Sequence, residues 1–135
     1  MPPATLVDSN VILDIATSDP RWAGWSEAAL ADAARSGPLL INVVVYAEVS
    51  VAYARVEDVD LMLPANLYGR APIPYAAAFL AAKAFVAYPR RGGQREQPLP
   101  DFLIGAHAAV SGLRLLTRDA RRYRTYFPRL ELIAP

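Results

Sequence analysis

The chain has 135 residues, of which 54% are hydrophobic and 20% are charged, and it contains no cysteine. This size and composition predict a single domain, residues 1–135, that buries its own core, and they exclude a disordered chain. The absence of cysteine excludes disulfides, thiolate metal sites and a cysteine nucleophile. The start of the chain is not typical of a signal peptide, and no apolar run approaches the ~20 residues that span a bilayer. We therefore expect a cytoplasmic protein with no membrane association.

The net charge of +1 conceals an uneven distribution. Residues 1–89 carry five Lys or Arg against nine Asp or Glu, a net charge of −4, whereas residues 90–135 carry nine Arg against four Asp or Glu, a net charge of +5. Arginine is the basic side chain best suited to bidentate phosphate contacts. The distribution indicates either a polyanion held near an acidic site or a solvated surface with ordinary ion pairs.

Along the chain, predicted strands alternate with predicted helices. Short apolar runs predict buried strands over residues 4–7, 39–41, 113–117 and 130–133. Alanine content and capping residues predict helices over residues 11–16, 22–35, 43–55, 56–63, 75–88, 99–111 and 119–123. Glycine and proline predict loops over residues 69–74 and 89–98. The order predicts an α/β fold with a mainly parallel sheet covered on both faces.

Four acidic residues occupy places where such a fold binds ligands. Asp8 directly follows the first predicted strand, and Asp119 lies two residues beyond the third. Glu48 lies in the helix after the second strand, and Asp101 lies in the first turn of the helix over 99–111. Open parallel sheets bind ligands outside the carboxyl ends of their strands. We therefore expect these four carboxylates to converge.

Converging carboxylates repel one another unless a cation neutralises them. Oxygen ligands without cysteine favour a hard ion, Mg²⁺ or Mn²⁺, present as one or two ions. Such an ion can orient a water molecule and stabilise a phosphodiester oxygen. Each acid taken alone could instead cap a helix or have a structural role. Their joint placement predicts metal-assisted phosphodiester hydrolysis.

Four segments resemble the motifs of the PIN domain family, and of its VapC toxins in particular. They are LVDSNVILD at 6–14, NVVVYAE at 42–48, LPDFLIGAHA at 99–108 and LLTRD at 115–119. The resemblance covers nearly the whole chain and implies a PIN-like, three-layer α/β/α fold. It implies a Mg²⁺-dependent endoribonuclease that cuts structured RNA, often transfer or ribosomal RNA. It also implies the toxin of a toxin–antitoxin pair, a homodimer inhibited by a VapB-type antitoxin.

The resemblance also implies residue roles. Asp8, Glu48 and Asp101 would hold the principal metal ion, and Asp119 would complete the acidic pocket or help to hold a second ion. Ser9 and Thr117 would supply hydroxyl groups to the pocket.

Several other polar residues are candidates for binding or catalysis. Arg90, Arg91 and Arg95 lie in the loop over 89–98, where they could contact phosphates or form a solvated surface. Arg118, Arg121 and Arg122 follow the third strand, with Tyr123 and Tyr126 nearby; they could hold RNA by charge and stacking, or form a solvated face. For His107, a packed, hydrogen-bonded histidine is favoured over a general base or a metal ligand.

Two alternative functions remain compatible with the residues. A catalytically inert PIN-fold module would bind RNA or a partner protein without turnover, although the presence of all four acids argues against it. A nuclease that acts on DNA would use the same carboxylates, because nothing in the residues distinguishes RNA from DNA.

Overall fold

Five short strands form one parallel sheet at the centre of the molecule. The computed structural model describes residues 2–89 and 98–135. The strands are β1 (Thr5–Val7), β2 (Leu39–Ile41), β3 (Tyr68–Arg70), β4 (Arg114–Leu116) and β5 (Leu132–Ile133). Their order in the sheet is β3-β2-β1-β4-β5, and every neighbouring pair is parallel. The predicted α/β class is therefore confirmed, with a sheet that is wholly parallel in the described residues.

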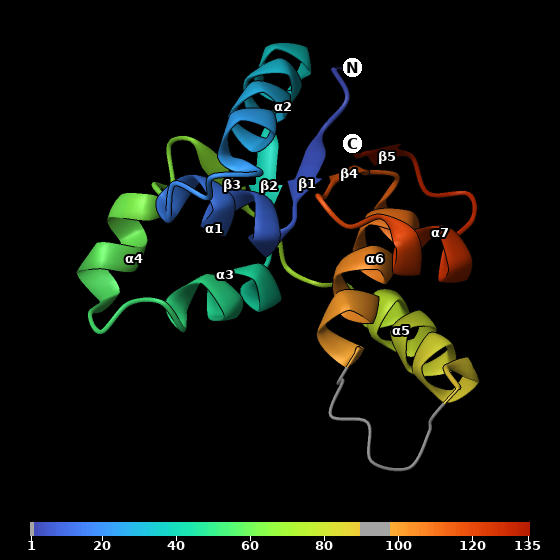
Figure 1. The fold of residues 1–135 in the computed structure, drawn as a ribbon. Coiled ribbons are helices and arrows are strands. Elements are labelled where there is room, and N and C mark those ends of the chain that lie inside the picture. The colour runs from blue at the N-terminus through green and yellow to red at the C-terminus, as the bar shows by residue number, and fades with distance from the viewer. Residues whose placement is uncertain (1, 90–97) are drawn as a thin grey trace.

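Seven helices in the described residues flank this sheet in an α/β/α arrangement (Figure 1). They are α1 (Ser9–Ala16), α2 (Ala23–Ser36), α3 (Val43–Ser50), α4 (Val56–Met62), α5 (Tyr75–Ala87), α6 (Leu99–Ser111) and α7 (Arg121–Tyr126). The helices α1 and α2 pack on each other, and α5 packs along α6. No helix in the described part of the chain is long and apolar enough to cross a membrane.

Local signals explain where three of these helices begin or end. The Asp8 side chain accepts a hydrogen bond from the backbone N–H of Ser9 at the start of α1, and Asn42 accepts one from Val45 at the start of α3. Helix α6 ends at Gly112, whose φ of 65° is in the left-handed region that glycine adopts without strain. The caps at Asn42 and Gly112 agree with the predicted boundaries, whereas α1 begins at Ser9, two residues before its predicted start at residue 11.

The chain changes direction across the sheet at β1. From β1 the chain first adds β2 and β3 on one side, and then returns to add β4 and β5 on the other. In open α/β sheets this change of direction leaves a crevice beyond the carboxyl ends of the two strands that flank it. Here those strands are β1 and β4, which are followed by Asp8 and Thr117.

Three sequence predictions about the elements were wrong. Residues 69–74 were expected to form a loop, but Tyr68–Arg70 is the edge strand β3. Its central residue is Gly69, which weakens the strand signal, and a Cβ there would lie 2.8 Å from Cδ2 of Leu40. The single helix expected over 43–55 ends at Ser50, and the helix expected over 119–123 is instead Arg121–Tyr126.

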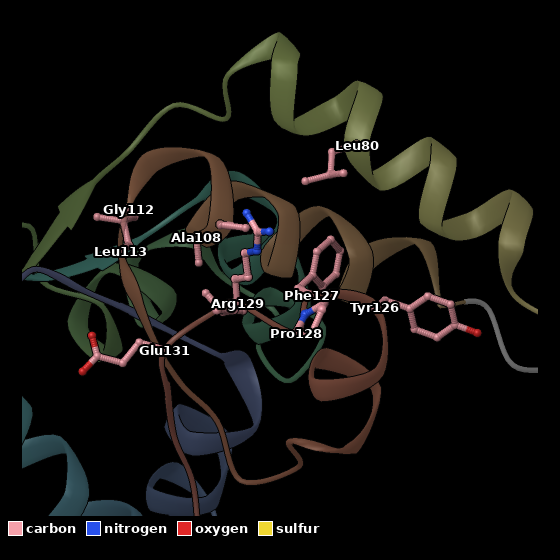
Figure 2. A pocket seen from close by; sticks show the side chains of 11 residues that line it. Leu80, Ala108, Gly112, Leu113, Tyr126, Phe127, Pro128, Arg129 and Glu131 are labelled. Atoms are coloured by element: carbon pink, nitrogen blue, oxygen red, sulfur yellow. The ribbon is translucent and has the colours of Figure 1, made fainter.

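An apolar pocket of about 490 Å³ lies between α5, the end of α6 and the chain after α7 (Figure 2). Leu80, Leu113 and Phe127 contribute to its lining, and Arg129 and Glu131 are its charged residues. None of the four predicted acids lines this pocket, so it is separate from the candidate site described next.

Candidate active site

The candidate site lies at the carboxyl ends of β1 and β4. The backbone N–H of Asp8 donates to the carbonyl oxygen of Leu116 at 2.9 Å, which joins the ends of the two strands. A polar pocket of about 670 Å³ opens here. All four predicted acids line it, namely Asp8, Glu48, Asp101 and Asp119. The predicted convergence on one pocket is therefore observed.

Asp8 is the most buried of these acids, with 4% of its surface exposed. Its Oδ1 accepts a hydrogen bond from the backbone N–H of Ser9 at 2.8 Å. Its Oδ2 accepts from the hydroxyls of Thr117 at 2.9 Å and Tyr123 at 3.0 Å. Donors from the residue after β4 and from α7 thus hold the carboxylate at the end of β1.

Burial and neighbouring charge act against the ionised form of Asp8. The pKa of Asp8 is raised from 3.8 to about 6; burial is the largest cause, and the charges of Asp101 and Glu48 also contribute. The hydrogen bonds from Thr117 and Tyr123 lower the pKa and offset part of the increase. The pocket therefore concentrates negative charge in a poorly solvated position, where a bound cation would stabilise the ionised form.

Glu48 faces Asp8 from α3. The hydroxyl of Ser9 donates to Oε1 of Glu48 at 2.9 Å and lies 3.5 Å from Oδ1 of Asp8, so Ser9 connects the two carboxylates. Burial raises the pKa of Glu48, the Ser9 hydrogen bond opposes this, and the charge of Asp101 adds to it. Ser9 lines the pocket, whereas Thr117 donates to Asp8 from a buried position outside the pocket lining.

Asp101 and Asp119 occupy less enclosed positions. Oδ2 of Asp101 lies 2.5 Å from Nη1 of Arg122 in an ion pair across the pocket wall. Asp119 is exposed, its backbone N–H donates to the Thr117 hydroxyl at 3.2 Å, and its Oδ1 accepts from the backbone N–H of Arg121. The charges that raise the pKa of Asp8 are those of Asp101 and Glu48, so Asp119 is the more peripheral acid.

The donor set suits a hard divalent cation, although the side chains are not arranged around one. In residues 2–89 and 98–135, no group of three or more His, Cys, Asp or Glu side chains stands ready to hold a metal ion. Asp101 is instead paired with Arg122. The carboxylate oxygens of Asp8, Glu48 and Asp101 are ligands of the kind that Mg²⁺ prefers, and the raised pKa of Asp8 indicates charge that a cation would neutralise. These carboxylates would therefore suit Mg²⁺ if Asp101 turned from Arg122 toward Asp8 and Glu48.

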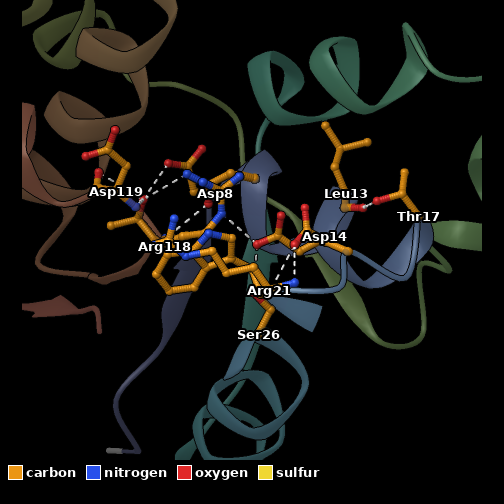
Figure 3. Close-up of polar contacts among 12 residues, drawn as sticks. Asp8, Leu13, Asp14, Thr17, Arg21, Ser26, Arg118 and Asp119 are labelled. Atoms are coloured by element: carbon orange, nitrogen blue, oxygen red, sulfur yellow. Dashed lines mark hydrogen bonds and ion pairs between the residues drawn. The ribbon is translucent and has the colours of Figure 1, made fainter. Parts of the chain in front are cut away.

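Arg118 lies outside the pocket lining, in contrast to Arg121 and Arg122. Its Nε is 2.8 Å from Oδ2 of the buried Asp14, which also accepts from the Ser26 hydroxyl at 3.0 Å (Figure 3). Its backbone N–H donates to Oδ1 of Asn10 at 3.1 Å. These contacts join the loop after β4 to α1 and α2, so Arg118 has a structural role here. Arg90, Arg91 and Arg95 lie outside the described residues.

The prediction that His107 is a packed histidine is confirmed. It is 2% exposed, it does not line the acidic pocket, and its Nδ1 lies 3.0 Å from Nδ2 of Asn42. Oδ1 of Asn42 is occupied by the N–H of Val45, so the amide donates and Nδ1 of His107 accepts. Burial lowers the pKa of His107, which favours the neutral ring that this hydrogen bond requires.

Sequence reasoning missed the roles of three residues. Tyr123 was expected to stack on RNA, but it is buried and donates to Asp8. Asn10 donates to the Thr117 hydroxyl at 3.3 Å, and Tyr88 lies beneath the guanidinium of Arg122. No local pattern indicated these contacts, because the partners are separated by 34 to 115 positions in the chain.

Comparison with known proteins agrees with this geometry. The model of the PIN domain matches residues 5–128. The chain therefore belongs to the PIN domain family. No curated protein sequence matches the chain significantly.

Solved structures share the fold over almost their full length. VapBC2 from Rickettsia felis, bound to a DNA fragment from its promoter, is 16% identical with a TM-score of 0.71, over 97% of this chain and 98% of that chain. A toxin–antitoxin complex from Klebsiella pneumoniae is 19% identical with a TM-score of 0.67, over 96% and 95%. FitAcB from Neisseria gonorrhoeae is 18% identical with a TM-score of 0.66, over 96% of each chain. At these identities the similarity establishes the fold alone.

Proposed function

We propose that this PIN domain is a metal-dependent endoribonuclease of the VapC type, the toxin of a toxin–antitoxin pair. The observation that carries the proposal is the convergence of Asp8, Glu48 and Asp101 on one pocket, where burial and mutual repulsion raise the pKa of Asp8 to about 6. Buried carboxylates that repel one another are typical of a site that binds a cation, because the cation stabilises their ionised form.

The kind of protein to which the chain is similar supports the toxin assignment. The solved structures with this fold include the VapBC2 structure from Rickettsia felis and a toxin–antitoxin complex from Klebsiella pneumoniae, and the match extends over nearly the whole of each compared chain. We propose by analogy that a VapB-type antitoxin inhibits this chain, that the chain forms a homodimer, and that its substrate is a structured RNA such as transfer or ribosomal RNA.

Asp8, Glu48 and Asp101 would hold Mg²⁺ or Mn²⁺, and Asp119 would assist with a second ion. When bound, the ion supplies an oriented water for in-line attack at phosphorus and stabilises the charge that develops on the phosphate. Thr117 and Tyr123 hold Asp8, and Ser9 holds Glu48, so the ligands keep their orientation before substrate arrives. Arg121 and Arg122 line the same pocket and supply positive charge for an RNA phosphate.

The proposal is tested with purified protein freed of antitoxin. It is incubated with total bacterial RNA and Mg²⁺ or Mn²⁺, beside a chelator control and the Asp8→Asn variant. The matched control is Asp32→Asn, which removes the same charge from an exposed carboxylate of α2. Discrete fragments with wild type and Asp32→Asn, and none with chelator or Asp8→Asn, are expected.

Two results would contradict the proposal. Cleavage by Asp8→Asn at the wild-type rate would show that the reaction does not depend on the Asp8 carboxylate. Intact RNA together with no calorimetric binding of Mn²⁺ would favour the inert RNA-binding or partner-binding module. A parallel digestion of single-stranded and duplex DNA decides between the RNA and DNA alternatives.

A further inference from the structure

Arg122 neutralises one of the pocket carboxylates. Nη1 of Arg122, on α7, lies 2.5 Å from Oδ2 of Asp101, in the first turn of α6. The side chains are 26% and 35% exposed, and both line the pocket that also contains Asp8 and Glu48. The pair therefore lies at the mouth of the acidic pocket, where both a metal ion and a substrate can reach it.

The Arg122 guanidinium has a second support that does not depend on Asp101. Its central carbon lies 5.4 Å from the centroid of the Tyr88 ring, within the range of a cation–π contact. Tyr88 is itself held by ring contacts with Phe102 and Tyr126, at centroid distances of 5.9 Å and 6.1 Å. Because of this support, Arg122 would remain at the pocket wall if Asp101 turned away from it.

The ion pair between Arg118 and Asp14 lies in the same region, has a structural role and serves as a comparison. Asp14, the partner of Arg118, is 4% exposed in its side chain and also accepts a hydrogen bond from Ser26. Neither Arg118 nor Asp14 lines the acidic pocket. The Arg122–Asp101 pair differs in both respects, since it is accessible and faces the pocket.

We propose that Arg122 acts as an internal counter-cation that competes with the metal ion for Asp101. Without metal, Arg122 neutralises Asp101. When a divalent ion draws Asp101 to the other carboxylates, Arg122 stays on the Tyr88 ring and binds a phosphodiester oxygen of the RNA. This inference rests on the proposed function for its RNA step, but its metal step concerns only the protein and the ion. It explains why the carboxylates converge without forming a ready metal site.

The metal step predicts a gain of affinity. Arg122→Gln removes the competitor and a nearby positive charge, so calorimetric titration of the RNA-free protein with Mn²⁺ should show binding about threefold or more tighter than in wild type, a size typical of a partly exposed ion pair. The control is Arg124→Gln, an exposed arginine of the same helix that does not line the pocket. Its Mn²⁺ affinity should stay within about twofold of wild type.

Misfolding cannot produce the expected result, because a disturbed site would bind the ion more weakly. Arg122→Lys serves as a second variant that keeps a positive charge but loses the planar contact with Tyr88. Its Mn²⁺ affinity should remain near that of wild type. Unchanged or weaker Mn²⁺ binding by a folded Arg122→Gln protein, or equal gains in Arg122→Gln and Arg124→Gln, would overturn the metal step.

The RNA step predicts a loss in the same variant. In cleavage assays at saturating Mn²⁺, Arg122→Gln should raise KM for RNA by about tenfold, the cost of one charge-assisted phosphate contact. A variant that binds Mn²⁺ more tightly and RNA more weakly is not expected of a purely structural arginine. Wild-type KM in Arg122→Gln would overturn this step. If the proposed function is wrong, the wild-type protein will not cleave RNA. The Mn²⁺ titrations would still test whether Arg122 competes with the metal ion for Asp101.

Discussion

The phenolic hydroxyl of Tyr123 donates a hydrogen bond of 3.0 Å to Oδ2 of Asp8, and so connects α7 with the end of β1. Tyr123 is 2% exposed, and burial raises its pKa well above 10.0, so the hydroxyl remains a donor over the physiological range. The last helix of the chain therefore helps to set both the orientation and the pKa of an acid in the first ten residues.

Loss of this hydroxyl should change the pH dependence of cleavage. The Tyr123 hydrogen bond lowers the pKa of Asp8, so Tyr123→Phe should raise that pKa further above about 6 and move the acid limb of the rate profile to higher pH. The free energy of unfolding should fall by about 1 kcal/mol. Cleavage rates from pH 5 to 8 and urea unfolding measure the two effects. Tyr75→Phe, at a 95% exposed position, is the control; a profile for Tyr123→Phe that coincides with this control would contradict the prediction.

Asp8 should also make the metal-free protein less stable as the pH rises. Its pKa is about 6 in the fold against 3.8 ordinarily, so the folded state binds the proton more tightly. The resulting stabilisation is complete below about pH 4 and is lost as the pH approaches and passes 6; the difference in pKa corresponds to about 3 kcal/mol. Urea unfolding in a chelator at pH values between 4 and 7 should show this decline in wild type and in Asp32→Asn.

Asp8→Asn should lack that contribution. Its free energy of unfolding should therefore exceed that of wild type at pH 7, and the two proteins should converge toward pH 4. If the free energy of unfolding depends on pH in the same way in wild type and Asp8→Asn, folding does not raise the pKa of Asp8 and the prediction is wrong.

Gly105 allows two aromatic rings to approach α6. A Cβ at this position would lie 2.6 Å from the ring of Phe127 and 2.9 Å from that of Tyr123, and both rings are buried. Gly105→Ala should therefore destabilise the protein by about 1–3 kcal/mol, although alanine favours helix, and should reduce cleavage by displacing Tyr123 from Asp8. Gly24→Ala meets no atom within 4 Å and should leave stability unchanged or slightly higher. Thermal unfolding compares the two; equal stabilities would contradict the packing argument.

Asn42 has two structural functions at the start of α3. Its Oδ1 accepts from Val45 at 3.0 Å, and its Nδ2 donates to the buried His107 at 3.0 Å. Asn42→Ala removes the cap and leaves the ring nitrogen without this donor, so a loss of about 2 kcal/mol is expected. The exposed Asn66→Ala should change stability by less than about 0.5 kcal/mol. Urea unfolding at pH 7.5 measures both, and a loss no larger in Asn42→Ala than in Asn66→Ala would refute this role.

The sequence by itself determined the α/β class and the place of the acids. Apolar runs that end at Asp8 and just before Asp119 marked the carboxyl ends of two strands, and parallel strands bring such ends to one edge of a sheet. Helix α6 was equally predictable, because Pro100 in its first turn and Gly112 after its last residue are local signals. Strand β3 was not, because three residues centred on a glycine carry almost no periodic signal, and the strand forms by pairing with β2.

Only the tertiary structure decided how the polar side chains pair. Arg118 and Arg122 are four residues apart and have the same side chain, yet one binds the buried Asp14 and the other binds Asp101 in the pocket. Tyr123, the residue directly after Arg122, is buried and donates to Asp8. These pairings form because α7 packs against α6 and because the ends of β1 and β4 lie side by side. This packing brings together residues up to 115 positions apart in the chain. Side-chain pairing over that separation depends on packing that local propensity does not encode.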